Sequence, residues 1–240
     1  MPTFYQEQLQ RKRPWEVRPV PKLPFVEEAA KTLTRALALR VLELEVKDWL
    51  EQGLKKEELP SDVVGCLRSN QQDEEKHDQI LSCCAKTYGL VSEEDDKTAQ
   101  ELHCAWVTHP DHPIVKAAVL ESSVFFVILP ILRTFGGVGL ALVSADISGD
   151  ESVHAAVHRH LAAELGHSYS SSLDKLRKET VAWMVNHLSV PEAGRLGKPN
   201  HWLNASDSLL ERGVSDLVET RRGVMPAFFE IPNHALPSYA

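Results

Sequence analysis

The chain has 240 residues, of which 43% are hydrophobic, so it can form one large domain or two small ones around a sizeable core. Its formal net charge is −8 and its sequence pI is about 5.8. Because a surface that contacts nucleic-acid phosphates needs concentrated lysine and arginine, this balance argues against a nucleic-acid-binding protein.

Cysteine usage indicates a reducing compartment. The four cysteines show neither a Cys-x-x-Cys pair nor the density of a secreted disulfide scaffold. No apolar signal segment is visible in the polar, proline-punctuated residues 1–24. We therefore expect a cytoplasmic location.

The first predicted element is an extended N-terminal arm over residues 1–26, because five prolines lie in its first 24 positions. A long helix is expected from Glu27 to Gly53, where apolar residues recur every three or four positions. A second helix, from Asp62 to Tyr88, is closed by Gly89. A short surface helix then follows, with Ser92 as its N-cap and four acidic residues in its first turn.

The most apolar run, Ile114–Phe135, carries two basic residues, a glutamate and a proline, so we expect a central buried helix and no membrane span. A fourth long helix is predicted from Leu140 to Leu165, stopped by Gly166. Two further helices are expected over 171–188 and 206–221, and residues 225–240 form an extended tail with three prolines. The predicted fold class is therefore all-α.

Two copies of the pattern Asp-Glu-x-x-His, Asp73–His77 and Asp150–His154, lie on the second and fourth long helices. On a helix, a Glu and a His three residues later lie on one face, so both can bind one ion. Two Glu-x-x-His units and a Glu from each of two further helices form the ligand set of a di-iron or di-manganese centre in a four-helix bundle.

Matched spacing connects each motif to a glutamate on the preceding helix. Glu45 precedes Glu74 by 29 residues, and Glu121 precedes Glu151 by 30. These intervals let the chain ascend one helix and return to the same height on the next. Glu121 is the sole acid in its apolar helix, whereas the first helix offers two candidates, Glu45 and Glu43. We favour Glu45, which has Val41, Leu42 and Trp49 on its own face.

A metal-ligating imidazole needs an acceptor for its other ring N–H, and Asp73 and Asp150 are placed to reach the histidine of the opposite hairpin. His158 lies four residues after His154 on the same face. It either supports the metal ligands or packs as an ordinary helix histidine.

On these motifs the chain resembles the ferritin-like di-iron carboxylate superfamily over about residues 30–166. That superfamily includes bacterioferritin, rubrerythrin, the ribonucleotide reductase small subunit and the aldehyde-deformylating oxygenase. The resemblance implies a ferritin-like four-helix bundle over residues 27–166, two additional helices in 167–224, and terminal arms at 1–26 and 225–240. It further implies bridging roles for Glu74 and Glu151, and six metal ligands that also form the catalytic centre: Glu45, Glu74, His77, Glu121, Glu151 and His154.

The expected function is that of a di-iron oxidoreductase, with manganese as the alternative metal in either position. It would use dioxygen to oxidise a small, apolar organic substrate. No dinucleotide fingerprint occurs in the sequence, so electrons would come from a ferredoxin or a separate reductase. Two alternatives remain, a ferroxidase or iron-handling protein, and a structural or assembly protein whose arms contact partners or join copies into a homo-oligomer.

Overall fold

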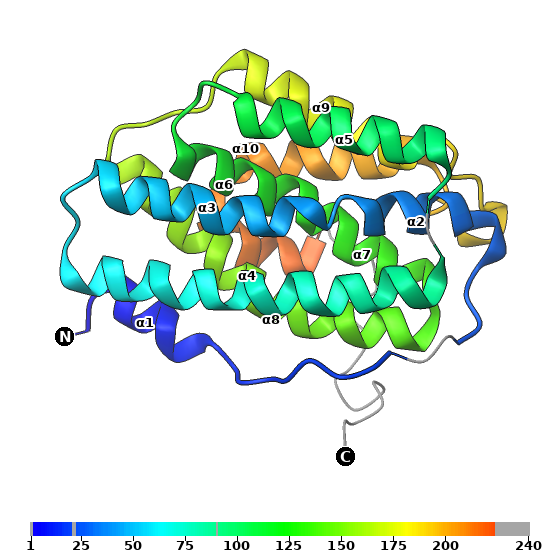
Figure 1. The fold of residues 1–240 in the computed structure, drawn as a ribbon, viewed down its shortest axis with the longest axis horizontal. Helices are drawn as coiled ribbons and strands as arrows, with labels where there is room; N and C mark the ends of the chain where they lie inside the picture. Colours follow the sequence, from blue (N-terminus) through cyan, green and yellow to red (C-terminus); the bar gives the residue numbers. More distant parts are fainter. Residues whose placement is uncertain (1, 21–22, 90, 224–240) are drawn as a thin grey trace.

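The computed structural model describes residues 2–20, 23–89 and 91–223, and all regular secondary structure in these ranges is helical (Figure 1). The all-α prediction is therefore confirmed. The α-helices are α1 (Phe4–Arg11), α2 (Ala30–Ala38), α3 (Val41–Lys56), α4 (Ser61–Tyr88), α5 (Glu93–Thr108), α6 (Pro113–Leu120), α7 (Phe126–Phe135), α8 (Gly137–Glu164), α9 (Ser171–Val185) and α10 (Pro199–Gly223). Short 3₁₀ helices cover Glu27–Ala29 and Pro191–Ala193, and a π-helix covers Glu121–Phe125.

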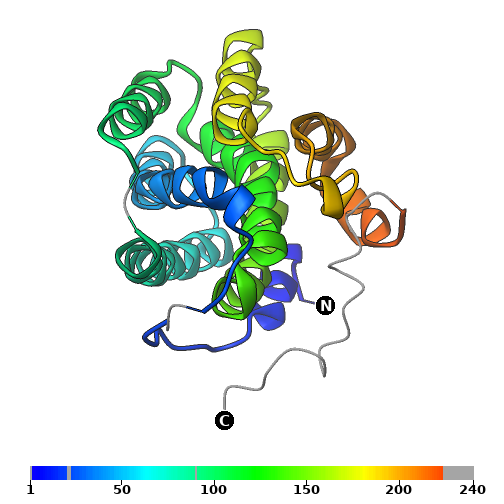
Figure 2. The ribbon, with the colours of Figure 1, turned by 90° about the vertical axis from the view of Figure 1, so that its right-hand side faces the viewer.

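Four long helical segments pack side by side around the core. Seen along their length, α3 and α4 form one pair and the α6–α7 segment and α8 form the other (Figure 2). The helix α3 packs on α4 and α6, and α8 packs on α4, α6 and α7. Each motif-bearing helix therefore faces the other motif-bearing helix and also the helix that precedes it in the chain.

The helix α5 lies on the outside of the bundle, against α2, α3 and α9, and carries the chain back along the molecule from α4 to α6 (Figure 1). It begins where α4 ends, and the chain then enters α6 at the far end of the fold. Ser92 caps α5 as predicted, because its hydroxyl accepts a hydrogen bond from the Asp95 N–H at 3.2 Å. This return explains the longer interval between the two hairpins that carry the motifs.

The predicted first helix, Glu27–Gly53, is not continuous. A turn at Leu39 and Arg40 separates α2 from α3. At this turn the backbone bonds shorten to three-residue steps, with the Leu42 N–H on Leu39 O at 3.0 Å and the Glu43 N–H on Arg40 O at 3.0 Å. No glycine or proline lies at this interruption. The recurrence of apolar residues continues through it, which is why the sequence predicted one continuous helix.

The apolar third helix is interrupted at its glutamate. Glu121–Phe125 forms a π-turn, and the hydroxyls of Ser122 and Ser123 donate to the carbonyl oxygens of Ala118 and Val119. Such turns insert one residue into a helix and are frequent at functional sites. Within the described residues, Pro113–Phe135 is the one helical stretch long and apolar enough to cross a membrane, and its most apolar 18 residues are all buried in the molecule.

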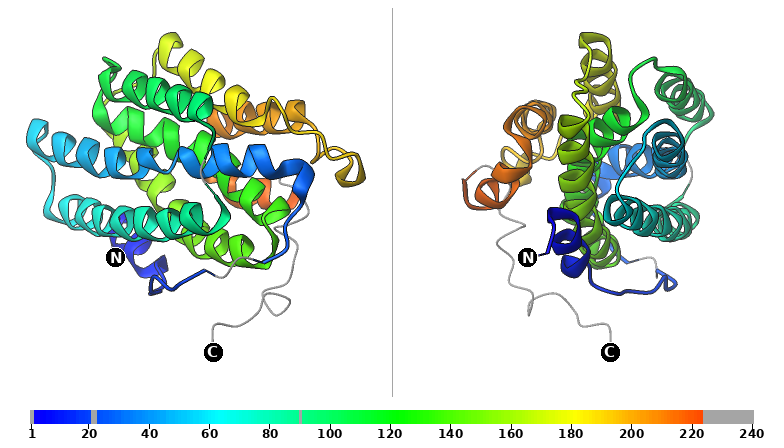
Figure 3. Two further views of the ribbon diagram at one scale, coloured as in Figure 1. Left: turned by 45° about the vertical axis from the view of Figure 1, so that its right-hand side comes forward. Right: turned by 90° about the vertical axis from the view of Figure 1, so that its left-hand side faces the viewer.

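The N-terminal arm differs from the prediction of an extended segment over residues 1–26. Residues 4–11 form α1 because Thr3 and Gln6 make a reciprocal capping box, a signal that the prolines outweighed in the sequence. Residues 12–20 run as extended chain along α4 and α8 of the same molecule (Figure 3). The arm is therefore docked on the body of the protein.

The two C-terminal helices pack against the other helices of the fold. Helix α9 lies on α2, α5 and α6, whereas α10 lies along the outer face of α7, α8 and the π-turn. Helix α10 begins at Pro199, seven residues before the predicted start at Ser206. The predicted tail, 225–240, lies outside the described residues.

Candidate metal centre

Four helical segments bring six ligand-type side chains to one place in the core. Each of these side chains has no exposed surface. They are Glu43 from α3, Glu74 and His77 from α4, Glu121 from the π-turn, and Glu151 and His154 from α8. Ligand atoms of Glu74, His77, Glu151 and His154 lie within 4.8 Å of one another, a grouping that can hold a metal ion.

The Nδ1 atom of His77 marks one half of the cluster. It lies 3.2 Å from Glu151 Oε1, 3.5 Å from Glu43 Oε2 and 3.6 Å from Glu74 Oε2. Three carboxylates from three different helices therefore surround one imidazole nitrogen.

The Nδ1 atom of His154 marks the other half. Its distances are 2.9 Å to Glu74 Oε1, 3.6 Å to Glu151 Oε1 and 3.8 Å to Glu121 Oε1. Glu74 and Glu151 thus approach both histidines, whereas Glu43 and Glu121 each approach one. The arrangement has two central carboxylates and one terminal carboxylate at each end.

The preference for Glu45 over Glu43 is wrong. The Glu45 carboxylate points to α5, where its Oε1 lies 2.9 Å from His103 Nε2. Both glutamates border the buried stripe of α3, but Glu43 lies on the flank that faces α4 and Glu45 on the flank that faces α5. Helical periodicity shows which positions border a buried stripe, and it does not show which neighbour each flank meets.

The two aspartates reach across the hairpins as expected. Asp73 Oδ2 on α4 accepts from Nε2 of His154 at 3.3 Å, and Asp150 Oδ2 on α8 accepts from Nε2 of His77 at 3.3 Å. Each bond fixes the ring orientation and leaves Nδ1 directed at the carboxylates.

His158 also belongs to the cluster, and it acts through Glu121. Its Nδ1–H donates to Glu121 Oε2 at 2.5 Å, and its Nε2 accepts from the Asn70 amide at 3.0 Å. Burial and the neighbouring His154 lower the pKa of His158, so the ring is neutral near pH 7. The sequence did not identify Asn70 as part of this cluster, because an asparagine one helical turn before a motif carries no distinctive signal.

Charge in the cluster is balanced between carboxylates and imidazoles. Burial raises the pKa values of Glu43 and Glu121 well above the ordinary range. Burial opposes the charged forms of His77 and His154, but the surrounding carboxylates outweigh it and raise both pKa values. Protons and cations would therefore compete for the same group of side chains.

The polar atoms at the centre fit a cation better than they fit one another. Nine buried side-chain atoms of the six residues have no hydrogen-bond partner among the described residues, including both oxygens of Glu43, Glu74 and Glu151 and Nδ1 of both histidines. An unpaired buried carboxylate oxygen costs free energy unless a proton or a metal ion compensates it. Imidazole nitrogen and carboxylate oxygen are ligands for iron, manganese and zinc.

The N-terminal segment covers the aspartate side of this cluster, which was not predicted. Lys12 Nζ lies 2.5 Å from Asp73 Oδ2, and Trp15 Nε1 donates to Asp150 Oδ2 at 2.7 Å. The Trp15 indole also lies parallel to the His77 ring, with ring centres 6.0 Å apart. Both aspartates are therefore hydrogen-bonded on their outer side by residues from one segment.

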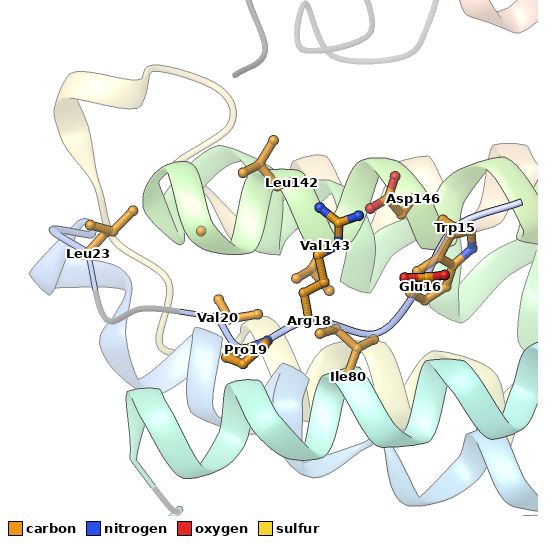
Figure 4. Close-up of a pocket in the computed structure, with 11 residues that line it drawn as sticks. Trp15, Glu16, Arg18, Pro19, Val20, Leu23, Ile80, Leu142, Val143 and Asp146 are labelled. Carbon is orange, nitrogen blue, oxygen red and sulfur yellow. The ribbon is translucent and has the colours of Figure 1, made fainter. Parts of the chain in front are cut away.

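A pocket of about 70 Å³ adjoins the covered side (Figure 4). Its walls come from the N-terminal segment, α4 and α8, and one lining residue, Trp15, also stacks on the His77 ring of the cluster. The lining is mainly apolar and includes Val20, Leu23, Ile80 and Val143.

No protein family, curated protein or solved structure matches the chain.

Proposed function

We propose that the chain is a ferritin-like di-iron protein that uses dioxygen to oxidise a small, apolar organic substrate. The observation that carries this proposal is the set of unpaired buried ligand atoms on Glu43, Glu74, His77, Glu121, Glu151 and His154. Two ions fit this set, since each half of the cluster offers one imidazole nitrogen and terminal and central carboxylates.

The residues of the chain would hold two cations and keep water away from them. Glu74 and Glu151, which approach both imidazoles, and Glu43 and Glu121, which each approach one, would hold the cations together with His77 and His154. Four carboxylates neutralise the charge of two divalent cations. Iron bound there would supply the redox chemistry for dioxygen reduction.

Proton placement is a further task of the side chains. The His158 Nδ1–H holds one oxygen of Glu121, so the other oxygen, which has no hydrogen-bond partner among the described residues, is directed at the cluster. Asp73 and Asp150 keep the Nε2 protons of the two imidazoles, which leaves each Nδ1 free to bind a cation.

The apolar pocket beside Trp15 favours a small substrate. A cavity that holds benzene has about 150 Å³, roughly twice the volume found here, so a substrate of that size requires movement of the N-terminal segment. Electrons would come from a ferredoxin or a separate reductase.

The test uses protein produced with iron. Elemental analysis is expected to find two iron ions per chain, and Glu121→Ala is expected to lose at least one. The dithionite-reduced protein is then supplied with oxygen and with aldehydes, fatty acids or small aromatics, and uptake should increase with one of these classes. Uptake that depends on added ferrous iron alone would indicate a ferroxidase, and protein without metal would indicate a structural role.

A further inference from the structure

A second group of metal-ligating side chains lies at one end of the bundle, far from the central cluster along α8. It consists of Glu57, His112 and His167, each of which offers a ligand atom within 4.8 Å of the others. These residues lie where α3 ends, α6 begins and α8 ends, so three helix ends meet there.

Backbone structure fixes all three positions. Glu57 closes α3, with its N–H on Gly53 O at 3.1 Å. His112 is the N-cap of α6, and its Nδ1 accepts from the Ile114 N–H at 3.4 Å. His167 follows Gly166, whose positive φ of 70° ends α8, and the His167 N–H bonds Ala162 O at 2.9 Å.

The distances suit a tetrahedral ion. Glu57 Oε1 lies 3.2 Å from His112 Nε2 and 3.6 Å from His167 Nε2. A tetrahedral zinc site with bonds of about 2.0–2.1 Å has ligand atoms about 3.3 Å apart. Only small side-chain movements would therefore bring the three atoms to one ion.

The chemistry of the atoms points the same way. The buried Nε2 of His112 has no hydrogen-bond partner among the described residues, although Glu57 is near. The two imidazoles are stacked with ring centres 4.0 Å apart, and the Nε2 atom of each lies near the same oxygen of Glu57.

We propose that Glu57, His112 and His167 form a zinc site that joins the ends of α3, α6 and α8. Two histidines and one glutamate are a ligand set that zinc takes in proteins, with water in the fourth position. The partial exposure of Glu57 and His167, 26% and 35% of their side-chain surfaces, gives an ion and its water access from solvent.

The experiment separates this site from the central cluster by using two metals. The full chain is loaded with iron, incubated with Zn²⁺, freed of excess metal and analysed for both elements. We expect His112→Asn and His167→Ala to lose about one zinc ion per chain and to keep their iron. Asparagine at 112 retains a side-chain oxygen that can cap α6.

Two controls make the result specific. His187→Ala removes an exposed histidine that is not in the cluster and should leave zinc content unchanged. Glu43→Gln should lose iron and keep this zinc, so failure of the central site is distinguishable from failure of the second one. X-ray absorption at the zinc edge of iron-loaded protein should show two histidine ligands. Equal zinc in the wild type and both cluster variants, or a zinc shell of oxygen alone, would overturn the proposal.

Discussion

Glu43 and Glu45 lie two residues apart on α3, and their side chains enter different environments. Glu43 is fully buried beside His77, whereas Glu45 contacts the partly exposed His103. Both are glutamates on the same helix, so they provide a matched pair of variants in which only the position differs.

Glu43→Gln is expected to reduce iron content by at least one ion per chain, because an amide is a poorer ligand than a carboxylate and no other acid replaces it. Glu45→Gln should keep the iron content of the wild type, because its carboxylate meets α5. Elemental analysis of the two purified variants measures the difference. If Glu45→Gln loses iron and Glu43→Gln does not, the assignment from the structure fails.

Asp73 and Asp150 present a second test at single positions. Replacing either with asparagine keeps an oxygen near the imidazole Nε2–H but removes the charge that orients the ring and raises its basicity. Metal affinity is expected to fall by about 10- to 100-fold in each variant. Competition with a chelator measures this loss, and Asp78→Asn on the same helix serves as the control. Equal affinities in all three variants would remove the proposed orienting role.

At the scale of helices, the sequence predicted which segments are helical better than it predicted how they contact one another. The paired motifs, the glycine stops and the apolar run identified α4, α8 and the α6–α7 segment, because periodicity and caps are local signals. The break at Leu39, the π-turn at Glu121 and the flank taken by Glu43 depend on neighbouring helices. The cross-hairpin bonds of Asp73 and Asp150 were predictable because spacing fixed both helices at one height.

One buried network joins three of these helices outside the metal cluster. Arg35 on α2 donates to Asp95 Oδ1 on α5 at 2.5 Å and 2.8 Å, and to the backbone oxygen of Trp183 on α9 at 2.6 Å. Both side chains of the ion pair are about 6% exposed. Arg35 on α2 therefore connects α5 with α9.

Asp95→Asn should lower the free energy of unfolding by about 3–5 kcal/mol at pH 7, because it leaves a buried guanidinium without its counter-charge. The hydrogen bonds from Arg35 lower the pKa of Asp95, so this stability is present above the unfolded carboxyl pKa of about 3.9 and is lost as pH falls through the lower folded value. The stability difference between wild type and variant should shrink in that acidic range.

Urea unfolding at several pH values measures this difference. Asp96→Asn is the control, since it removes an exposed acid from the same first turn of α5 and should cost less than about 1 kcal/mol. A stability difference for Asp95→Asn that stays constant from pH 7 to the acidic range would contradict the ion-pair explanation.

At the scale of the whole molecule, the N-terminal segment is anchored on α4, α7 and α8, and between these anchors it contacts the two aspartates. The Val26 N–H bonds Phe135 O at 2.9 Å, Thr87 donates to Val20 O at 3.2 Å, and Tyr5 is 5% exposed with its hydroxyl on Glu164. Between these anchors, Lys12 and Trp15 bond the two aspartates behind the candidate metal centre. Docking of the segment should therefore control access to the cluster.

Gly137 tests this coupling, because it lies where α8 begins and the N-terminal segment passes over it. Its φ is +70°, and a Cβ there would lie 2.0 Å from the carbonyl oxygen of Pro24. Gly137→Ala should cost at least about 1–2 kcal/mol from the backbone alone and should also displace the segment. In the native protein, tryptic cleavage after Lys12 and removal of iron by a chelator should both become faster.

Gly149→Ala on the same helix is the control. No atom lies within 4 Å of the added Cβ, so this variant should stabilise the protein by about 0.5–1 kcal/mol and leave both rates unchanged. If Gly137→Ala accelerates cleavage without changing iron release, the segment is docked but does not guard the metal centre.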